Sequence, residues 1–106
     1  MITNDLNNEF RNPQNNTYLD SMTNEFGLLQ SIYPMGANAF AQTNTFGLVK
    51  NAVDNIMRKN NIQTYNIVPT SFVETCDGGS YEVNVAVNYT NNSKLETYVI
   101  NLITEY

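Results

Sequence analysis

The feature that most constrains the fold is a strict alternation of side chains between residues 81 and 90. Tyr81, Val83, Val85, Val87 and Tyr89 are separated by residues that are polar or small. Successive side chains of a β-strand point to opposite faces, so this period of two predicts a strand with one apolar and one polar face. We expect this strand to belong to an antiparallel β-meander.

Two further strands are predicted on either side of it. Residues 64–76 are rich in β-branched and aromatic residues, but Pro69 cannot donate to a strand ladder and predicts an edge strand or an interruption there. Turns are expected over 77–80 and 90–94, before a last strand over 95–105. In the C-terminal segment one face carries Tyr98, Ile100, Leu102 and Tyr106, and the other carries Val99 and Ile103. Apolar groups on both faces indicate a strand that is covered on both sides or that adds to a neighbouring sheet.

The clearest helix is predicted over residues 45–59, with Thr43, Asn44 or Thr45 as its N-cap and Asn60-Asn61 at its end. Its apolar stripe, with helical spacing, consists of Val49, Ala52, Val53, Ile56 and Met57. Arg58 and Lys59 follow the stripe, where they complement the negative end of the helix dipole or contact a ligand. The predicted fold class is therefore α+β, an amphipathic helix followed by a three-stranded antiparallel meander, in a single domain over 17–106.

The first sixteen residues are polar, with few apolar members and a proline at position 13. This composition predicts an extended N-terminal arm over 1–16 that is ordered by a partner chain or by packing on its own domain. Residues 17–34 predict one or two short helical turns broken near Gly27, and a loop follows to about residue 43.

Charge and composition exclude several classes of function. The net charge is −5 with scattered cations, so we expect no nucleic-acid partner, because phosphate binding needs a basic stripe. No apolar run is long enough to span a bilayer, and no secretion signal is visible, so we expect no membrane partner and no export. The single cysteine, Cys76, cannot form an internal disulfide and fits a reducing compartment. The 19 asparagines have two explanations, drift of an AT-rich genome toward asparagine codons or an amide surface that binds neighbouring protein chains.

Catalytic chemistry is difficult to assemble from these residues. The chain has no histidine, which removes hydrolytic triads and histidine-ligated zinc, and one cysteine cannot make a Cys-rich metal site. A pair of carboxylates remains formally possible, but it would need an apolar pocket to raise one pKa. We therefore expect no enzyme, no cofactor and no metal.

The order of the features resembles a known family. Glu25-Phe26-Gly27, the helix through residues 49–53 and the final hairpin of residues 81–89 and 95–103 resemble the small baseplate-wedge and tail sheath-initiator family (lysozyme-like) of contractile phage tails. Two motifs depart from that family. Its helix closes with a Glu-Pro-Arg type element, for which this chain has only Arg58 or Lys59, and the Gly-Glu/Ser-Arg stretch before Phe-Gly is absent.

The resemblance implies a virion protein of the tail, assembled in the host cytoplasm, whose C-terminal hairpin pairs with strands of sheath subunits. The implied partners are other virion chains of the tail sheath, baseplate or neck, in a symmetric assembly. The alternatives are another connector in the neck or head, or a small acidic inhibitor of a host protein. The predicted partner-binding residues are Tyr98, Val99, Ile100, Leu102, Ile103, Tyr106, Arg58 and Lys59.

Overall fold

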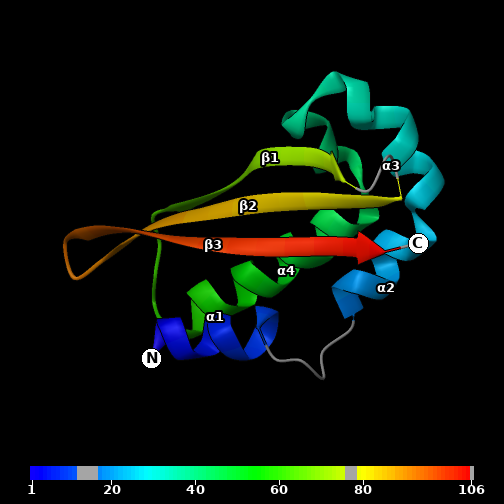
Figure 1. The fold of residues 1–106 in the computed structure, drawn as a ribbon. Helices are drawn as coiled ribbons and strands as arrows, with labels where there is room; N and C mark the ends of the chain where they lie inside the picture. The colour runs from blue at the N-terminus through cyan, green and yellow to red at the C-terminus, as the bar shows by residue number, and fades with distance from the viewer. Residues whose placement is uncertain (12–16, 76–78, 106) are drawn as a thin grey trace.

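The computed structural model describes residues 1–11, 17–75 and 79–105 (Figure 1). Its elements in chain order are α1 (Ile2–Phe10), α2 (Thr17–Asn24), α3 (Phe26–Ile32), the 3₁₀ helices η1 (Tyr33–Met35) and η2 (Ala37–Gln42), α4 (Asn44–Lys59), β1 (Tyr65–Thr75), β2 (Ser80–Asn91) and β3 (Lys94–Glu105). Helices precede a three-stranded antiparallel sheet of order β1-β2-β3. The predicted α+β class with a C-terminal meander is confirmed.

The register of the sheet is set by one tight turn and disturbed at one proline. Asn91 pairs with Lys94, and Asn92 and Ser93 between them have φ of 52° and 66°, the left-handed pair that a two-residue hairpin turn requires. On the other side of β2, the register with β1 shifts between Pro69 and Ser71. Proline has no N–H for the ladder, which accounts for an irregularity at this position.

The core lies between α4 and one face of the sheet. Val49, Val53 and Met57 of α4 are fully buried, as are the alternating valines of β2 that the sequence pattern identified. Figure 1 shows α1, α2 and α4 along one side of the strands, with the 3₁₀ region beside β1. Exposed apolar side chains on the other side, such as those of Val68 and Val99, show that this sheet face is open.

The start and end of α4 follow the predicted signals. The side chain of Thr43 accepts a hydrogen bond from the Phe46 amide at 3.0 Å, which satisfies one of the unpaired N–H groups of the first turn. At the other end Asn61 adopts a φ of 60°, and the Ile62 amide bonds back to the Met57 carbonyl at 2.8 Å. The helix predicted over 45–59 is confirmed, with its first residue at Asn44.

The predicted extended arm is wrong for residues 2–10, which form α1. Ile2, Leu6 and Phe10 recur every four residues, so a helix gathers them on one face, and the first two are buried in the core. The chain's own domain therefore orders this segment through an apolar face that its polar composition obscured. Residues 12–16 lie outside the described part of the chain.

The segment between α1 and α4 is more helical than predicted. The break that we expected near Gly27 lies at Glu25, between α2 and α3, and Gly27 is inside α3. The predicted loop of residues 34–43 is largely two 3₁₀ helices that bury Ala39 and Phe40. Gly36 joins them with a φ of 90°, a conformation that favours glycine.

Candidate functional site

The outer edge of β3 is a long strand edge with no proline and no register shift, and α2 lies beside its end, where the Thr23 and Thr104 hydroxyl oxygens are 3.3 Å apart. The sheet order places β3 at one side, paired only with β2 among the described strands, and its register runs without a shift from residue 94 to residue 105. Charges occur near its ends, at Lys94, Glu96 and Glu105, while residues 97–104 contain no charge and no proline. Natural sheets usually blunt such edges with charges, prolines or bulges, because unpaired N–H and C=O groups attract another strand.

The opposite edge, β1, has those protections. Pro69 interrupts its donors, the register shifts beside it, and η2 packs against the strand through Phe40 and Phe72, whose ring centroids are 6.2 Å apart. The two edges of one sheet therefore differ, because the β1 edge contains a proline and a register shift and the β3 edge contains neither.

The predicted partner-binding residues of β3 separate onto two faces. Tyr98, Ile100 and Leu102 are buried in the chain's own core, so a partner strand reaches their backbone and not their side chains. The Tyr98 hydroxyl donates to Asn7 Oδ1 at 2.7 Å, which ties α1 to β3. Val99 and Ile103 point outward and are 44% and 45% exposed. Tyr106 lies outside the described residues, as does Cys76.

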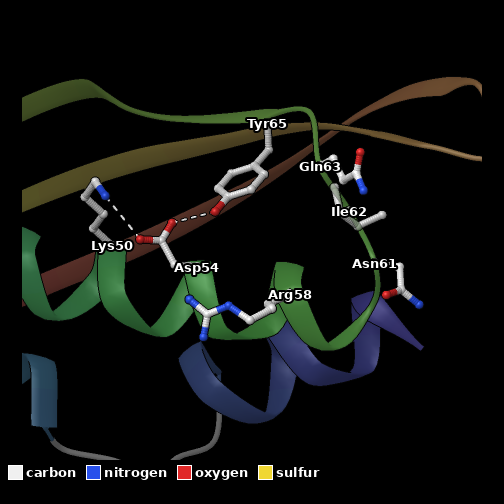
Figure 2. Close-up of a pocket in the computed structure, with 7 residues that line it drawn as sticks. All are labelled: Lys50, Asp54, Arg58, Asn61, Ile62, Gln63 and Tyr65. Atoms are coloured by element: carbon white, nitrogen blue, oxygen red, sulfur yellow. Dashed lines mark hydrogen bonds and ion pairs between the residues drawn. The ribbon is translucent and has the colours of Figure 1, made fainter.

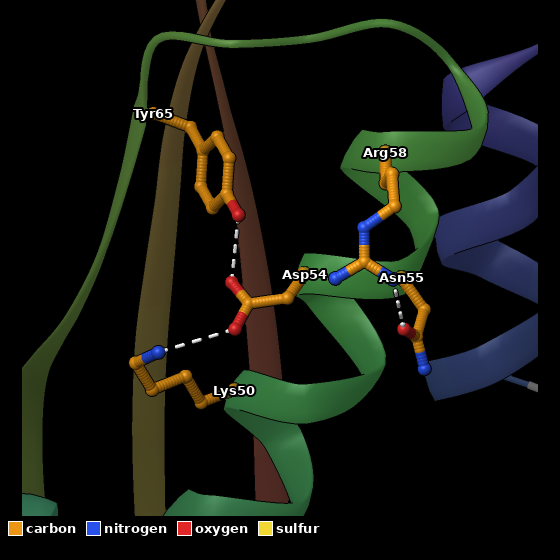
Figure 3. Close-up of polar contacts among 5 residues, drawn as sticks. All are labelled: Lys50, Asp54, Asn55, Arg58 and Tyr65. Carbon is orange, nitrogen blue, oxygen red and sulfur yellow. Dashed lines mark hydrogen bonds and ion pairs between the residues drawn. The ribbon is translucent and has the colours of Figure 1, made fainter.

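Arg58 and Lys59, predicted as a basic pair, point to different places. The Lys59 ammonium lies 3.5 Å from Asp5 of α1, so it contributes to holding that helix. The Arg58 guanidinium donates to Asn55 at 3.3 Å and lines a hollow between α4 and β1 (Figure 3). Only Arg58 therefore faces this hollow.

The open sheet face is organised in rows that cross all three strands. The register aligns Val68, Ala86 and Val99 in one apolar row, and Ala86 is only 7% exposed because a larger side chain stands on each side of it. Such cross-strand neighbours lie about 5 Å apart and stabilise each other.

A polar row lies on each side of this apolar row. Thr97 Oγ1 donates to Asn88 Oδ1 at 2.7 Å, and Asn88 Nδ2 donates to Asn66 Oδ1 at 2.9 Å. In the second row Asn101 Nδ2 donates to Asn84 Oδ1 at 2.8 Å, and Asn84 Nδ2 donates to Ser71 Oγ at 3.0 Å. The abundance of asparagine suggested an amide surface, but the rows depend on the register and were not predicted.

The Glu25-Phe26-Gly27 element has a structural role at the start of α4. The Glu25 carboxylate accepts hydrogen bonds from the Asn44 amide at 2.9 Å, the Thr45 amide at 2.8 Å and the Thr45 hydroxyl at 2.6 Å. A carboxylate at a helix N-terminus satisfies unpaired N–H groups and complements the dipole. The next residue, Phe26, is buried with its ring centroid 5.3 Å from that of Tyr81. The element joins the α2–α3 junction to both α4 and the sheet.

The hollow between α4 and β1 also brings polar groups together (Figure 2). Asp54 lies at its centre, where Oδ2 is 3.1 Å from the Lys50 ammonium and Oδ1 accepts from the Tyr65 hydroxyl at 2.7 Å (Figure 3). The remaining described lining residues are Arg58, Asn61, Ile62 and Gln63.

The protonation states of Asp54 and Tyr65 fit a structural contact. Burial raises the pKa of Asp54, but the hydrogen bonds from Tyr65 and Lys50 and the positive charges of Lys50 and Arg58 outweigh it and leave the pKa below its ordinary value. The hydrogen bond to Asp54 raises the pKa of Tyr65, so its phenol stays protonated at neutral pH. An ionised Asp54 with both oxygens occupied is a poor general acid, and the described lining offers no second carboxylate. Asp54 therefore links β1 to α4.

In the described ranges 1–11, 17–75 and 79–105, no group of three or more His, Cys, Asp or Glu side chains could hold a metal ion. No helix found there is both long enough and apolar enough to cross a membrane. Comparison of the chain with models of known protein families found no match, and comparisons with curated proteins and with solved structures also found none.

Proposed function

We propose that this chain is a structural and assembly protein of a phage virion, a tail baseplate component that starts sheath assembly by accepting a strand at β3. The observation that carries the proposal is the contrast between the uninterrupted, uncharged edge of β3 over residues 97–104 and the blunted edge of β1. The order of the sequence motifs supports the tail location by resemblance.

Strand addition fits the energetics of this sheet. The helices complete the core on the inner face, and α2 lies beside the end of β3 at Thr104, so strand addition would use the part of the edge around Val99. An added strand would pair with the open N–H and C=O groups, and main-chain hydrogen bonds of this kind supply affinity while side chains supply specificity. Val99 and Ile103 are both about half exposed, and the added strand would remove part of their apolar surface from contact with water.

A binding role also agrees with the chemistry that the described residues offer. The carboxylate of Asp54 is occupied by internal contacts with Tyr65 and Lys50, and that of Asp5 by contacts with Asn60 and Lys59. We therefore propose no catalytic activity and no cofactor, with other protein chains of the virion as the partners.

A lysine at the edge of β3 tests this proposal. In Val99→Lys we expect at least tenfold less of the chain to be incorporated into purified phage tails, because strand pairing would bury part of the new charge. The matched control is Val73→Lys, since Val73 lies on the same sheet face at the β1 edge and is 42% exposed. The readout is the amount of chain per particle by quantitative mass spectrometry, with folding of both variants checked by circular dichroism.

A structure of the assembled particle provides the direct observation. We expect β3 to be hydrogen-bonded to a strand from another subunit within the baseplate. A β3 edge left bare in solvent would contradict strand addition, and a neck or head position would contradict the tail assignment alone.

A further inference from the structure

We infer that the strand joining β3 carries uncharged hydrogen-bond donors at two outward-facing positions four residues apart, with an aliphatic residue midway between them. The inference rests on the proposed strand addition and specifies the partner's side chains. Asn, Gln, Ser and Thr are the residues that supply such donors.

The basis is the direction of the two polar rows. In both, the β3 side chain donates to β2 and the β2 side chain donates to β1, from Thr97 through Asn88 and from Asn101 through Asn84. The hydrogen bonds of each row therefore all run in one direction, and the end of the row that can still accept lies at the β3 edge.

Glu82 fixes this direction in the row of Asn101. Asn101 Nδ2 donates to Glu82 Oε2 at 2.8 Å as well as to Asn84, so both of its N–H groups are used. A carboxylate can only accept, so turning the Asn101 amide would set one oxygen against another. The polar atom that remains on Asn101 is Oδ1, to which none of the described residues donates.

Thr97 ends the other row in the same way. Its single hydroxyl proton is used toward Asn88, which leaves oxygen lone pairs on an exposed side chain. Thr97 and Asn101 are four residues apart on one strand face, and Val99, the end of the apolar row, lies between them. The β3 edge therefore presents acceptor, aliphatic group and acceptor at alternate positions.

An added strand places its side chains about 5 Å from those of β3 in the same rows. It satisfies this edge when it presents donor, aliphatic residue and donor at alternate positions, a pattern that reads the same in both strand directions. Asp or Glu in the polar rows would set oxygen against oxygen. The match would also fix the register, because a one-residue slip would move every side chain to the other face.

A second copy of this chain fits the edge poorly. Antiparallel pairing of two β3 strands about Val99 would set Thr97 of each copy opposite Asn101 of the other, so acceptors would meet in both rows. The β1 edge of another copy has donors in Asn66 and Ser71, but Pro69 and the register shift interrupt its backbone. The geometry therefore favours a strand from a different protein.

Two synthetic peptides test the inference on the full-length chain. Both are nine-residue peptides designed as β-strands, with lysines at their ends and valine at the central outward-facing position. They differ only at the next outward-facing position on each side of this valine, which is threonine in one peptide and valine in the other. Valine matches threonine in shape without its hydroxyl. We expect the threonine peptide to bind about thirtyfold more tightly, since two hydrogen bonds of about 1 kcal/mol each correspond to that ratio at about 1.4 kcal/mol per tenfold change. Affinity and location come from NMR titration of the backbone amides of residues 97–104.

Two variants of the chain test the assignment to the β3 edge. In Thr97→Val we expect the preference for the threonine peptide to fall to about fivefold, because one acceptor is lost and one hydrogen bond remains. Ser71→Ala, at the other end of a row, should leave the preference unchanged.

The outcomes separate this inference from the proposed function. Equal affinity of both peptides at β3 would overturn the donor pattern and leave strand addition intact. Binding of neither peptide at residues 97–104 would count against both proposals. A wild-type dimer paired through β3 in sedimentation and NMR would overturn the argument from facing acceptors.

Discussion

At the scale of single residues, Glu25 connects parts of the chain that are distant in sequence. Its carboxylate receives two backbone amides and one hydroxyl at the start of α4 while its own backbone lies at the junction of α2 and α3. Thr43 caps the same helix locally. The N-terminus of α4 thus has a local cap and a tertiary cap, and only the local one was predicted.

Removal of the tertiary cap should destabilise the whole domain. For Glu25→Ala we expect the free energy of unfolding to fall by about 1–3 kcal/mol, because two helix N–H groups lose a charged acceptor in a partly buried position. Urea denaturation followed by circular dichroism measures the loss. The control, Asp20→Ala on the exposed side of α2, should change it by at most about 0.5 kcal/mol. An unchanged midpoint in Glu25→Ala would show that Glu25 is not a cap in solution.

At the scale of elements, α1 is held by one apolar and one polar set of contacts. Ile2 and Leu6 enter the core, while Asp5 accepts from the Asn60 amide at 2.9 Å and lies 3.5 Å from the Lys59 ammonium. The hydrogen bond from Asn60 has the largest effect on the pKa of Asp5 and lowers it. Burial opposes this effect, the charge of Lys59 adds a smaller lowering, and the pKa lies below its ordinary value. The docking of α1 is therefore linked to the ionisation of Asp5.

Acid should loosen α1 through this linkage. The folded-state pKa of Asp5 is below its unfolded value near 3.8, so its stabilising contribution is present above that pH and is lost as the pH falls through the folded pKa. We expect hydrogen exchange of the α1 amides to accelerate below about pH 4, relative to the exchange of the β2 amides.

Asp5→Asn should remove that component of the pH dependence, because the replaced side chain does not titrate. Asp20→Asn should keep the wild-type profile. Identical profiles for wild type and Asp5→Asn would show that the Asp5 contacts do not hold α1.

At the scale of the whole molecule, the sheet has one closed face and one open face. The helices close the inner face, and α1 completes this layer beside β3 through Leu6 and the hydrogen bond from Tyr98 to Asn7. The outer face keeps its rows of amides and valines in solvent. The outer face is thus exposed, and α2 lies beside the end of the β3 edge at Thr104.

Deletion of residues 1–11 should open the closed face. We expect the free energy of unfolding to fall by about 3 kcal/mol or more, because Ile2 and Leu6 no longer cover the core. Leu6→Ala, which keeps the helix but removes most of one buried side chain, should cost about 2–4 kcal/mol. Chemical denaturation measures both values, and sedimentation velocity should show increased association of the deletion variant. A deletion variant as stable as the full chain would place α1 outside the core in solution.

The elements whose signal is local could be predicted from the amino-acid sequence. The period of two over residues 81–90 specified a strand, and the stripe with helical spacing ending at Met57 specified α4, because backbone geometry ties each repeat to one conformation. The same alternation separated Val99 and Ile103 from Tyr98 and Ile100. It could not show which of these two faces the helices would cover.

The docking of α1 and the rows of the open face depend on tertiary contacts. Ile2 and Leu6 are too few to bury themselves, so α1 depends on surface that α4 and β3 provide. The docking of α1 places Asp5 beside the Lys59 ammonium, whereas Arg58 lies beside the hollow. The polar rows required the register, which the Asn92–Ser93 turn and the core packing set together. Alternation fixes the face of each side chain, whereas its neighbour across the sheet depends on where the strands are joined.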